Sequence, residues 1–353
     1  MKQVKGILKI IVVTALAAGT VILVVLLSGG NSGGPKDTYR SPTLFAMDTT
    51  LQISIQGQGR ELSEANVEEC VALTEEIESI TSRFVPDSDV SLINANAGNT
   101  PVEVHPETME ILQRSLEFSR LSDGAFDVTV APIAELWGFY DREYQVPKPE
   151  EVEAARSLVD YRKVLIDEAN DTVMLAEPGM QIDLGGVAKG YAVGAMCDML
   201  KGRGVNSALV NFGGTVGAVG RRSDGEPWVI GIRDPRGEAC DLLGKLKLED
   251  SYVSSSGDYE RFFTRDGTRY CHLFDPRTGY QSRGVESDTV AGSDPMNADI
   301  LSTAVFVLGK DKGFALVGGQ DGYEALMVER DGSVVMTPGM KERYVIEIKN
   351  GVK

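Results

Sequence analysis

The sequence DLGGVAKGYAVG occupies residues 183–194, between a strand-like run at 172–176 and an apolar-periodic segment that should continue as a helix to about Leu200. Two glycines at a strand-to-helix turn let the backbone approach a ligand closely, and the free N–H groups that open the helix favour an anion. Lys189 lies in the first turn, where a cation gains nothing from the helix dipole, so it fits better beside a bound negative charge. We therefore predict a phosphate-binding turn; a glycine-rich turn with a solvated lysine is the alternative.

A second stretch, NADILSTAVFVLG at residues 297–309, has the apolar spacing of a helix. Asp299 and Thr303 are four residues apart, so they project from one face of this helix, next to its apolar stripe. A carboxylate and a hydroxyl one turn apart suit Mg²⁺, which takes few protein oxygens and completes its shell with phosphate and water. The alternative is an acid that favours the helix dipole and a threonine that bonds back to the preceding turn.

A third stretch, YCHLFDPRTGY at residues 270–280, predicts a short strand ended by a Pro-Arg-Thr-Gly turn. His272 should lie on the strand face opposite Cys271 and Leu273. The chain has only one other histidine, His105, so His272 is the better-placed base for chemistry near neutral pH. A structural histidine on a half-buried strand is the alternative.

In this order and spacing, the three stretches resemble the ApbE-like FAD:protein FMN transferase (flavin transferase) family, whose patterns include D-L-G-G-x-A-K-G-Y-A, H-x-x-D-P-x-T-G and A-D-x-x-x-T-A. Other parts of the sequence also match the family, and together the similarity extends from about residue 44 to residue 348. These further matches are at residues 47–49, 82–84, 87–88, 124–130, 136–139, 211–214 and 255–259.

The resemblance implies an enzyme that cleaves FAD to AMP and attaches FMN through a phosphoester to a Thr or Ser hydroxyl of an acceptor protein. By family analogy, Asp299, Thr303 and the backbone carbonyl of Gly186 would hold Mg²⁺, and His272 would accept the proton of the attacking hydroxyl. The expected contacts to FAD are Met47, Phe84, Ala125, Phe126, Asp127, Asp183 and Lys189. Asp48 departs from the family, which usually has glycine at this position.

Two other functions use the same ligands. One is an FAD pyrophosphatase, which would release FMN and AMP to water; the other is a non-catalytic extracytoplasmic FAD-binding protein. A pure binder has no use for His272 or for the Asp299–Thr303 pair, so their joint presence favours an enzyme. The resemblance implies that the acceptor is a membrane redox subunit carrying a threonine near small residues.

Residues 1–40 predict a membrane anchor followed by a flexible tether. Three lysines precede an uncharged run from Ile10 to Leu27, which with its flanks is long enough to cross a bilayer at about 1.5 Å per residue. The basic flank should stay in the cytoplasm, which makes the protein a single-pass protein of the cell membrane with its remainder outside the cytoplasm. A cleaved signal peptide is the alternative.

Residues 41–353 predict one FAD-binding catalytic domain of the α+β class, with mixed or antiparallel sheets and segregated helices. Amphipathic patterns predict helices at 62–84 and 107–121, whereas 124–130 reads as a turn and short strand. Short strands dominate after Arg162, including one at 207–217. The formal charge of −17 argues against a nucleic-acid partner. Four cysteines fit no metal spacing; a disulfide between Cys240 and Cys271 stays open.

Overall fold

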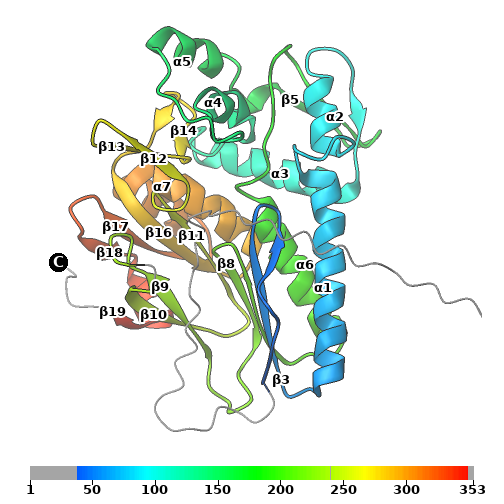
Figure 1. Cartoon of the computed structure of the whole chain (residues 1–353), viewed down its shortest axis with the longest axis vertical. Helices are drawn as coiled ribbons and strands as arrows, with labels where there is room; N and C mark the ends of the chain where they lie inside the picture. The colour runs from blue at the N-terminus through cyan, green and yellow to red at the C-terminus, as the bar shows by residue number, and fades with distance from the viewer. Residues whose placement is uncertain (1–37, 239, 349–353) are drawn as a thin grey trace, which may run out of the picture.

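The computed structural model describes residues 38–238 and 240–348 and has an antiparallel sheet at its centre (Figure 1). This sheet has nine strands in the order β1-β3-β7-β8-β11-β16-β17-β18, with β2 paired to β3. Its strands are β1 (Thr38–Arg40), β2 (Leu44–Ala46), β3 (Thr49–Gln56), β7 (Ser207–Phe212), β8 (Thr215–Gly220), β11 (Tyr252–Gly257), β16 (Val285–Gly292), β17 (Glu324–Glu329) and β18 (Val334–Met336). The predicted α+β class with antiparallel sheets is confirmed.

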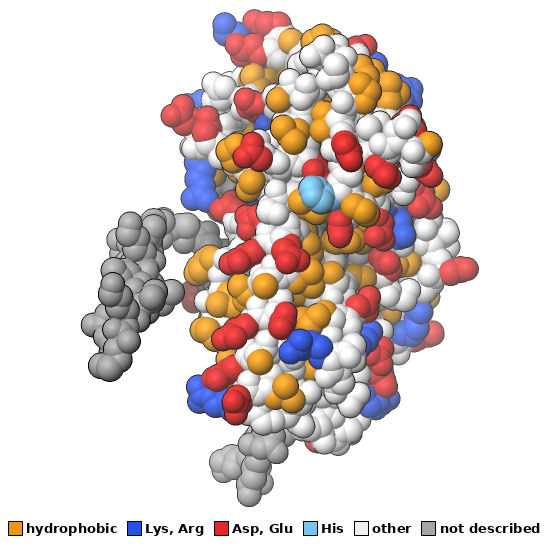
Figure 2. Space-filling view, turned by 90° about the vertical axis from the view of Figure 1, so that its right-hand side faces the viewer, with side chains coloured by type: hydrophobic (Ala, Val, Ile, Leu, Met, Phe, Trp, Pro, Cys, Tyr) orange, Lys and Arg blue, Asp and Glu red, His pale blue; other side chains and the backbone are white. Residues whose placement is uncertain are grey.

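Two helices cover one face of the sheet: α6 (Ala188–Gly202) packs against β7 and β8, and α7 (Pro295–Gly318) packs against β11 and β16. The long helix α1 (Arg60–Thr81) lies outside α6 (Figure 1). The face that carries α1 has acidic side chains spread along it, a charge distribution that repels a polyanion (Figure 2).

The opposite face of the sheet is covered by a three-stranded sheet of β9 (Trp228–Arg233), β10 (Leu242–Leu248) and β19 (Val345–Ile348). Alternating residues of β9 and β10 bury their side chains against this face, as a half-buried strand requires. The short helix α8 (Pro338–Arg343) closes this layer.

A smaller region of helices and short strands lies above α6 and α7 and completes the fold (Figure 1). Its helices are α2 (Asp89–Ala95), α3 (Pro106–Leu121), α4 (Ala131–Leu136) and α5 (Pro149–Arg156), and its sheet joins β4 (Val102–Glu103), β6 (Thr172–Leu175) and β5 (Val164–Asp167). Two hairpins, β12 (Phe262–Arg265) with β13 (Thr268–Cys271) and β14 (Phe274–Asp275) with β15 (Tyr280–Gln281), lie beside it.

Two local predictions were wrong. The strand expected at 207–217 is a hairpin, because Gly213 and Gly214 have φ values of 55° and 98° and turn the chain between β7 and β8. The strand expected within 124–130 is a 3₁₀ turn at Val128–Val130, which Asp127 caps through its side chain. The helix predicted at 297–309 is confirmed: it is the first part of α7, which is interrupted at Gly309, where φ is 72°.

The predicted membrane anchor falls in residues 1–37, outside the described part of the chain. Among the helices at 38–238 and 240–348, none is long and apolar enough to span a bilayer. All four cysteines are free; Cys271 is buried while Cys240 is exposed, so the disulfide left open between them is not formed.

Gly190 allows α6 to approach the first turn of α7 closely. A Cβ at this position would lie 2.5 Å from the Pro295 carbonyl oxygen and 2.9 Å from Asp299 Cβ. We expect Gly190→Ala to lower the free energy of unfolding by about 1–3 kcal/mol, because backbone must move to admit the methyl group.

Gly202, at the end of the same helix, is the matched control. A Cβ there meets nothing within 4 Å. Gly202→Ala should therefore leave stability unchanged or raise it by up to about 1 kcal/mol, as expected for alanine in a helix. Urea unfolding of both variants measures the difference; equal stabilities would contradict the close approach of the two helices.

Candidate functional site

Asp299 is the centre of the site. It lies in the second turn of α7, is 3% exposed, and receives hydrogen bonds from three other elements. Its Oδ1 accepts from Ser254 Oγ at 2.8 Å and from Thr215 Oγ1 at 3.2 Å, while its Oδ2 accepts from the Gly190 backbone N–H at 3.0 Å. These donors hold the buried carboxylate in a fixed position.

Thr303 lies one turn after Asp299 and faces the glycine turn before α6. A Cβ built on Gly186 would lie 3.6 Å from Thr303 Oγ1 and 3.1 Å from the Phe126 ring. The predicted magnesium ligands Asp299, Thr303 and Gly186 are therefore brought together at the meeting point of α6 and α7. A single carboxylate among neutral oxygens fits Mg²⁺, which keeps several water or phosphate ligands.

Lys189 reaches back over the glycine turn. Its Nζ donates to the Gly185 carbonyl at 2.8 Å and lies 3.4 Å from Asp299 Oδ2, with the side chain 21% exposed. Within the protein, Lys189 faces the carboxylate of Asp299. The bound negative charge that the sequence predicts beside this lysine stays a prediction. An ammonium group in this position is also available to a phosphate placed over the turn.

Asp183 holds the turn from the other side. Its Oδ1 accepts from the Gly185 N–H at 2.7 Å, and its Oδ2 accepts from the Tyr140 hydroxyl at 2.5 Å. Arg83 lies over the Tyr140 ring, 3.9 Å from its centroid. Tyr140 was not predicted as a site residue, because no local pattern connects it to a carboxylate 43 positions away.

Phe84 is 63% exposed and meets Tyr140 edge to face, with ring centroids 5.6 Å apart. An exposed aromatic ring beside a polar site is available for stacking on a planar ligand. Met47 lies in the turn between β2 and β3 and packs against both main core clusters. Trp137 and Phe139, in contrast, belong to a buried hydrophobic cluster.

Ala125, Phe126 and Asp127 are buried at 1%, 4% and 6% exposure. The Asp127 carboxylate accepts from Thr129 at 2.6 Å and from the Tyr161 N–H at 2.9 Å, so its side chain is used inside the protein. Burial raises the pKa of Asp127 to about 6. Of these three residues, Phe126 lies against the glycine turn: its ring is 3.1 Å from a Cβ built on Gly186.

His272 lies in a two-residue break between β13 and β14, which corrects the single strand predicted there. Its backbone N–H donates to the Arg261 carbonyl at 3.0 Å, and its Nδ1 lies 3.3 Å from the same oxygen. Burial, aided by the charges of Arg261 and Lys189, lowers the pKa of His272 to about 3. The ring is therefore neutral near pH 7 and able to accept a proton. Phosphate groups of a bound ligand would raise this pKa.

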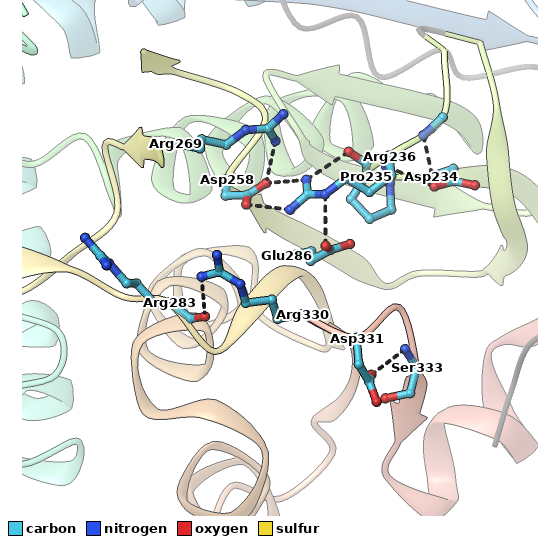
Figure 3. Close-up of polar contacts among 11 residues, drawn as sticks. Asp234, Pro235, Arg236, Asp258, Arg269, Arg283, Glu286, Arg330, Asp331 and Ser333 are labelled. Carbon is cyan, nitrogen blue, oxygen red and sulfur yellow. Dashed lines mark hydrogen bonds and ion pairs between the residues drawn. The ribbon is translucent and has the colours of Figure 1, made fainter. Parts of the chain in front are cut away.

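Glu260 is a further acid of the site that sequence patterns did not single out. Burial raises its pKa to about 7, an effect opposed by the positive charges of Lys189 and Arg261. The segment that carries it is held by Asp258, on which Arg236 and Arg269 converge, with Glu286 bound to the same Arg236 (Figure 3). The feature of the sequence that could have indicated Glu260 is the pair of acids, Asp258 and Glu260, that follows Ser254–Ser256.

Asp288, on β16, is fully buried, and within the described residues neither carboxyl oxygen has a hydrogen-bond partner. Burial, with the charge of Glu260, raises its pKa well above the usual value. In the unfolded chain an aspartate loses its proton near pH 4. Stability should therefore fall as the pH rises above about 4, until the pH reaches the raised pKa of the folded state.

We expect Asp288→Asn to remove this dependence, because the amide cannot ionise. The free energy of unfolding of the variant, relative to the parent, should increase by about 1.4 kcal/mol for each pH unit above 4 over that window. Urea unfolding at pH 4, 5.5 and 7 measures it. A difference that does not change with pH would show that Asp288 ionises normally in the folded protein.

The chain also matches known proteins in sequence and in structure. The ApbE family model matches residues 47–327. The chain is 33% identical to an FAD:protein FMN transferase of Klebsiella pneumoniae over 259 residues, covering 73% of this chain and 80% of that protein. It is 35% identical to one of Treponema pallidum over 293 residues, covering 79% and 81%.

Among solved structures, the ApbE protein of Thermotoga maritima superposes with a TM-score of 0.79 at 36% identity, covering 86% of this chain and 98% of that protein. The matched region contains the glycine turn, both site helices and His272. By sequence and by fold, this chain belongs to the ApbE family.

Proposed function

We propose that the protein is a Mg²⁺-dependent FAD:protein FMN transferase, the activity that its relatives carry in their names. The observation that supports this most is the convergence of Asp299, Thr303, Gly186 and Lys189 where α6 meets α7. A carboxylate, neutral oxygens and a lysine at a helix start provide what a bound pyrophosphate and its metal need.

In the proposed reaction, a Thr or Ser hydroxyl of the acceptor protein attacks the phosphorus of the FMN half of FAD. A new P–O bond forms to the hydroxyl oxygen, and the P–O bond to AMP breaks, so that AMP leaves with the bridging oxygen. The hydroxyl proton goes to the neutral His272 ring. No oxidation or reduction occurs, and no covalent intermediate with this chain is needed.

Asp299, Thr303 and the Gly186 carbonyl would hold Mg²⁺, whose chemistry is to neutralise charge on the phosphate oxygens. Lys189 would contact FAD phosphate or ribose, and Asp183, fixed by Tyr140, would orient the nucleotide. Phe84, through its exposed ring, would stack on the flavin, with Met47 and residues 125–127 completing the pocket.

One experiment separates this function from its two alternatives. The full chain is incubated with FAD, Mg²⁺ and a candidate acceptor protein, and the products are measured by mass spectrometry. A gain of one FMN on the acceptor supports transfer. Free FMN and AMP would identify an FAD pyrophosphatase, and intact bound FAD would identify a binding protein.

For the N-terminus, we propose that residues 1–40 anchor the protein in the cell membrane and that residues 41–353 form the catalytic domain outside the cytoplasm. The three lysines and the uncharged run after them support this arrangement. The acceptor would then be a membrane redox subunit on the same side. Protease added to intact cells should digest the catalytic domain while Met1 or Lys2 stays membrane-bound; a mature N-terminus near Gly29 would show a signal peptide instead.

A further inference from the structure

We propose that Asp48 is a positioning residue for the transfer reaction: it holds Arg261, and the Arg261 carbonyl holds the His272 ring. The inference rests on the proposed function, because it assigns His272 the role of the base. It concerns a residue that sits outside the glycine turn and the two site helices, in the hairpin between β2 and β3.

The hairpin turn itself is unusual. Ala46 pairs with Thr49, which leaves Met47 and Asp48 as the two turn residues, with φ values of 46° and 57°. A two-residue turn with both φ values positive normally contains Asn-Gly or Asp-Gly, because side chains disfavour this conformation. Aspartate tolerates it better than most residues, yet glycine at position 48 would remove the remaining strain. The turn therefore keeps a carboxylate where backbone geometry alone favours none.

The carboxylate of Asp48 links three separate segments. Its Oδ2 lies 2.9 Å from Arg261 Nη2, and its Oδ1 lies 3.5 Å from Arg142 Nη2. The three side chains are 55%, 46% and 60% exposed. Ion pairs this exposed contribute little to folding stability, so stability alone does not account for the carboxylate.

Arg261 carries the effect of Asp48 to His272. The Arg261 carbonyl accepts the His272 backbone N–H at 3.0 Å and lies 3.3 Å from Nδ1 of the ring. A proton on Nδ1, shared with this carbonyl, leaves the lone pair of Nε2 free to accept the hydroxyl proton. The segment is fixed at its other end by the contacts of Asp258 with Arg236 and Arg269 (Figure 3). Asp48 thus fixes the end nearest the ring.

The test is Asp48→Asn, which keeps a residue that tolerates the turn and removes the charge. We expect kcat for FMN transfer to fall about 5- to 20-fold, since small displacements of a reacting group are costly, while the Kd for FAD changes less than about twofold. Asp48→Gly, which also relaxes the turn, should lose the same activity. In Arg261→Gln, adding Asp48→Asn should cause no further loss, because the two residues act in series.

The matched control is Glu347→Gln. Glu347 and Lys245 form an ion pair of 2.8 Å with side chains 59% and 29% exposed, close to the Asp48–Arg261 pair in length and exposure but on the opposite layer of the fold. This variant should transfer FMN at the parental rate. A loss as large as that of Asp48→Asn would mean that any exposed ion pair has this effect, which would overturn the inference.

A readout independent of activity is the ¹⁵N spectrum of the histidine rings, since the chain has only two histidines. The Nδ1 atom of His105 lies 2.9 Å from Asp89 Oδ1. The signals of His105 are assigned as those that disappear from the spectrum of His105→Gln. Asp48→Asn should shift the His272 signals and leave those of His105 in place. Unshifted His272 signals with a parental kcat would overturn the inference. If the parent itself transfers no FMN, the proposed function fails, and the ring shift alone decides the role of Asp48.

Discussion

Replacing Asp299 with alanine should reduce FMN transfer by about 10³-fold. The substitution removes the only carboxylate among the proposed magnesium ligands, at a point where the negative charge of a pyrophosphate must be neutralised. It also leaves the Gly190 N–H and the Ser254 and Thr215 hydroxyls without their acceptor. We therefore expect a loss of stability of about 1–3 kcal/mol in addition to the loss of activity.

Asp299→Asn separates the two effects. The amide oxygen can still accept from Ser254, while the amide NH2 group faces the Gly190 N–H and cannot accept from it. The loss of stability should therefore be smaller than that of Asp299→Ala, whereas the missing charge should still abolish Mg²⁺-dependent turnover. Transfer is measured by mass spectrometry across a Mg²⁺ titration, and unfolding by urea. Parental turnover of Asp299→Asn, or turnover of the parent in EDTA, would remove the metal from the mechanism.

Replacing His272 with glutamine should reduce FMN transfer by about 10²–10⁴-fold, the usual contribution of a general base. Glutamine resembles histidine in reach and can hydrogen-bond to the Arg261 carbonyl, so the break between β13 and β14 should persist. Affinity for FAD should change little, because the base is aimed at the incoming hydroxyl. Single-turnover transfer, FAD binding and melting temperature are measured on the same preparation.

The pH dependence gives a second test of His272. Because its pKa in the free enzyme is lowered to about 3, the ring stays neutral at all higher pH values, and kcat/KM of the parent should show no acid limb from this residue between pH 5.5 and 9. A variant that binds FAD, melts normally and transfers at the parental rate would leave Glu260 or Asp275 as the base. If Glu260 is the base, the loss of its charge below its pKa of about 7 would lower kcat/KM on the acid side of that pH range.

Local sequence determined the helices and the spacing of residues within them. Apolar periodicity placed α1, α3, α6 and the first part of α7 to within a few residues, and it put Asp299 and Thr303 on one face. Such features depend on residues three or four positions apart, which a single stretch contains. Short strands were also found by their composition, although their ends and the hairpin at Gly213–Gly214 were not.

The order of strands and helices in space decided the rest of the site. Thr215 and Ser254 meet Asp299 because β8 and β11 are neighbours under α7, and Tyr140 meets Asp183 across 43 positions. Phenylalanine is an apolar residue type that usually lies in the core. Phe84 follows the end of α1, however, and its ring is 63% exposed.

What the sequence by itself determined is therefore the family, the fold class and the chemical types at the site, since these are carried by motifs whose parts are close in the chain. Only the tertiary structure decided that Asp48 reaches Arg261 and that Arg261 holds His272. The physical reason is that one contact joins segments more than 200 positions apart, and the other joins the two ends of the β12–β13 hairpin. Their distances depend on sheet register and helix packing, which no local periodicity encodes.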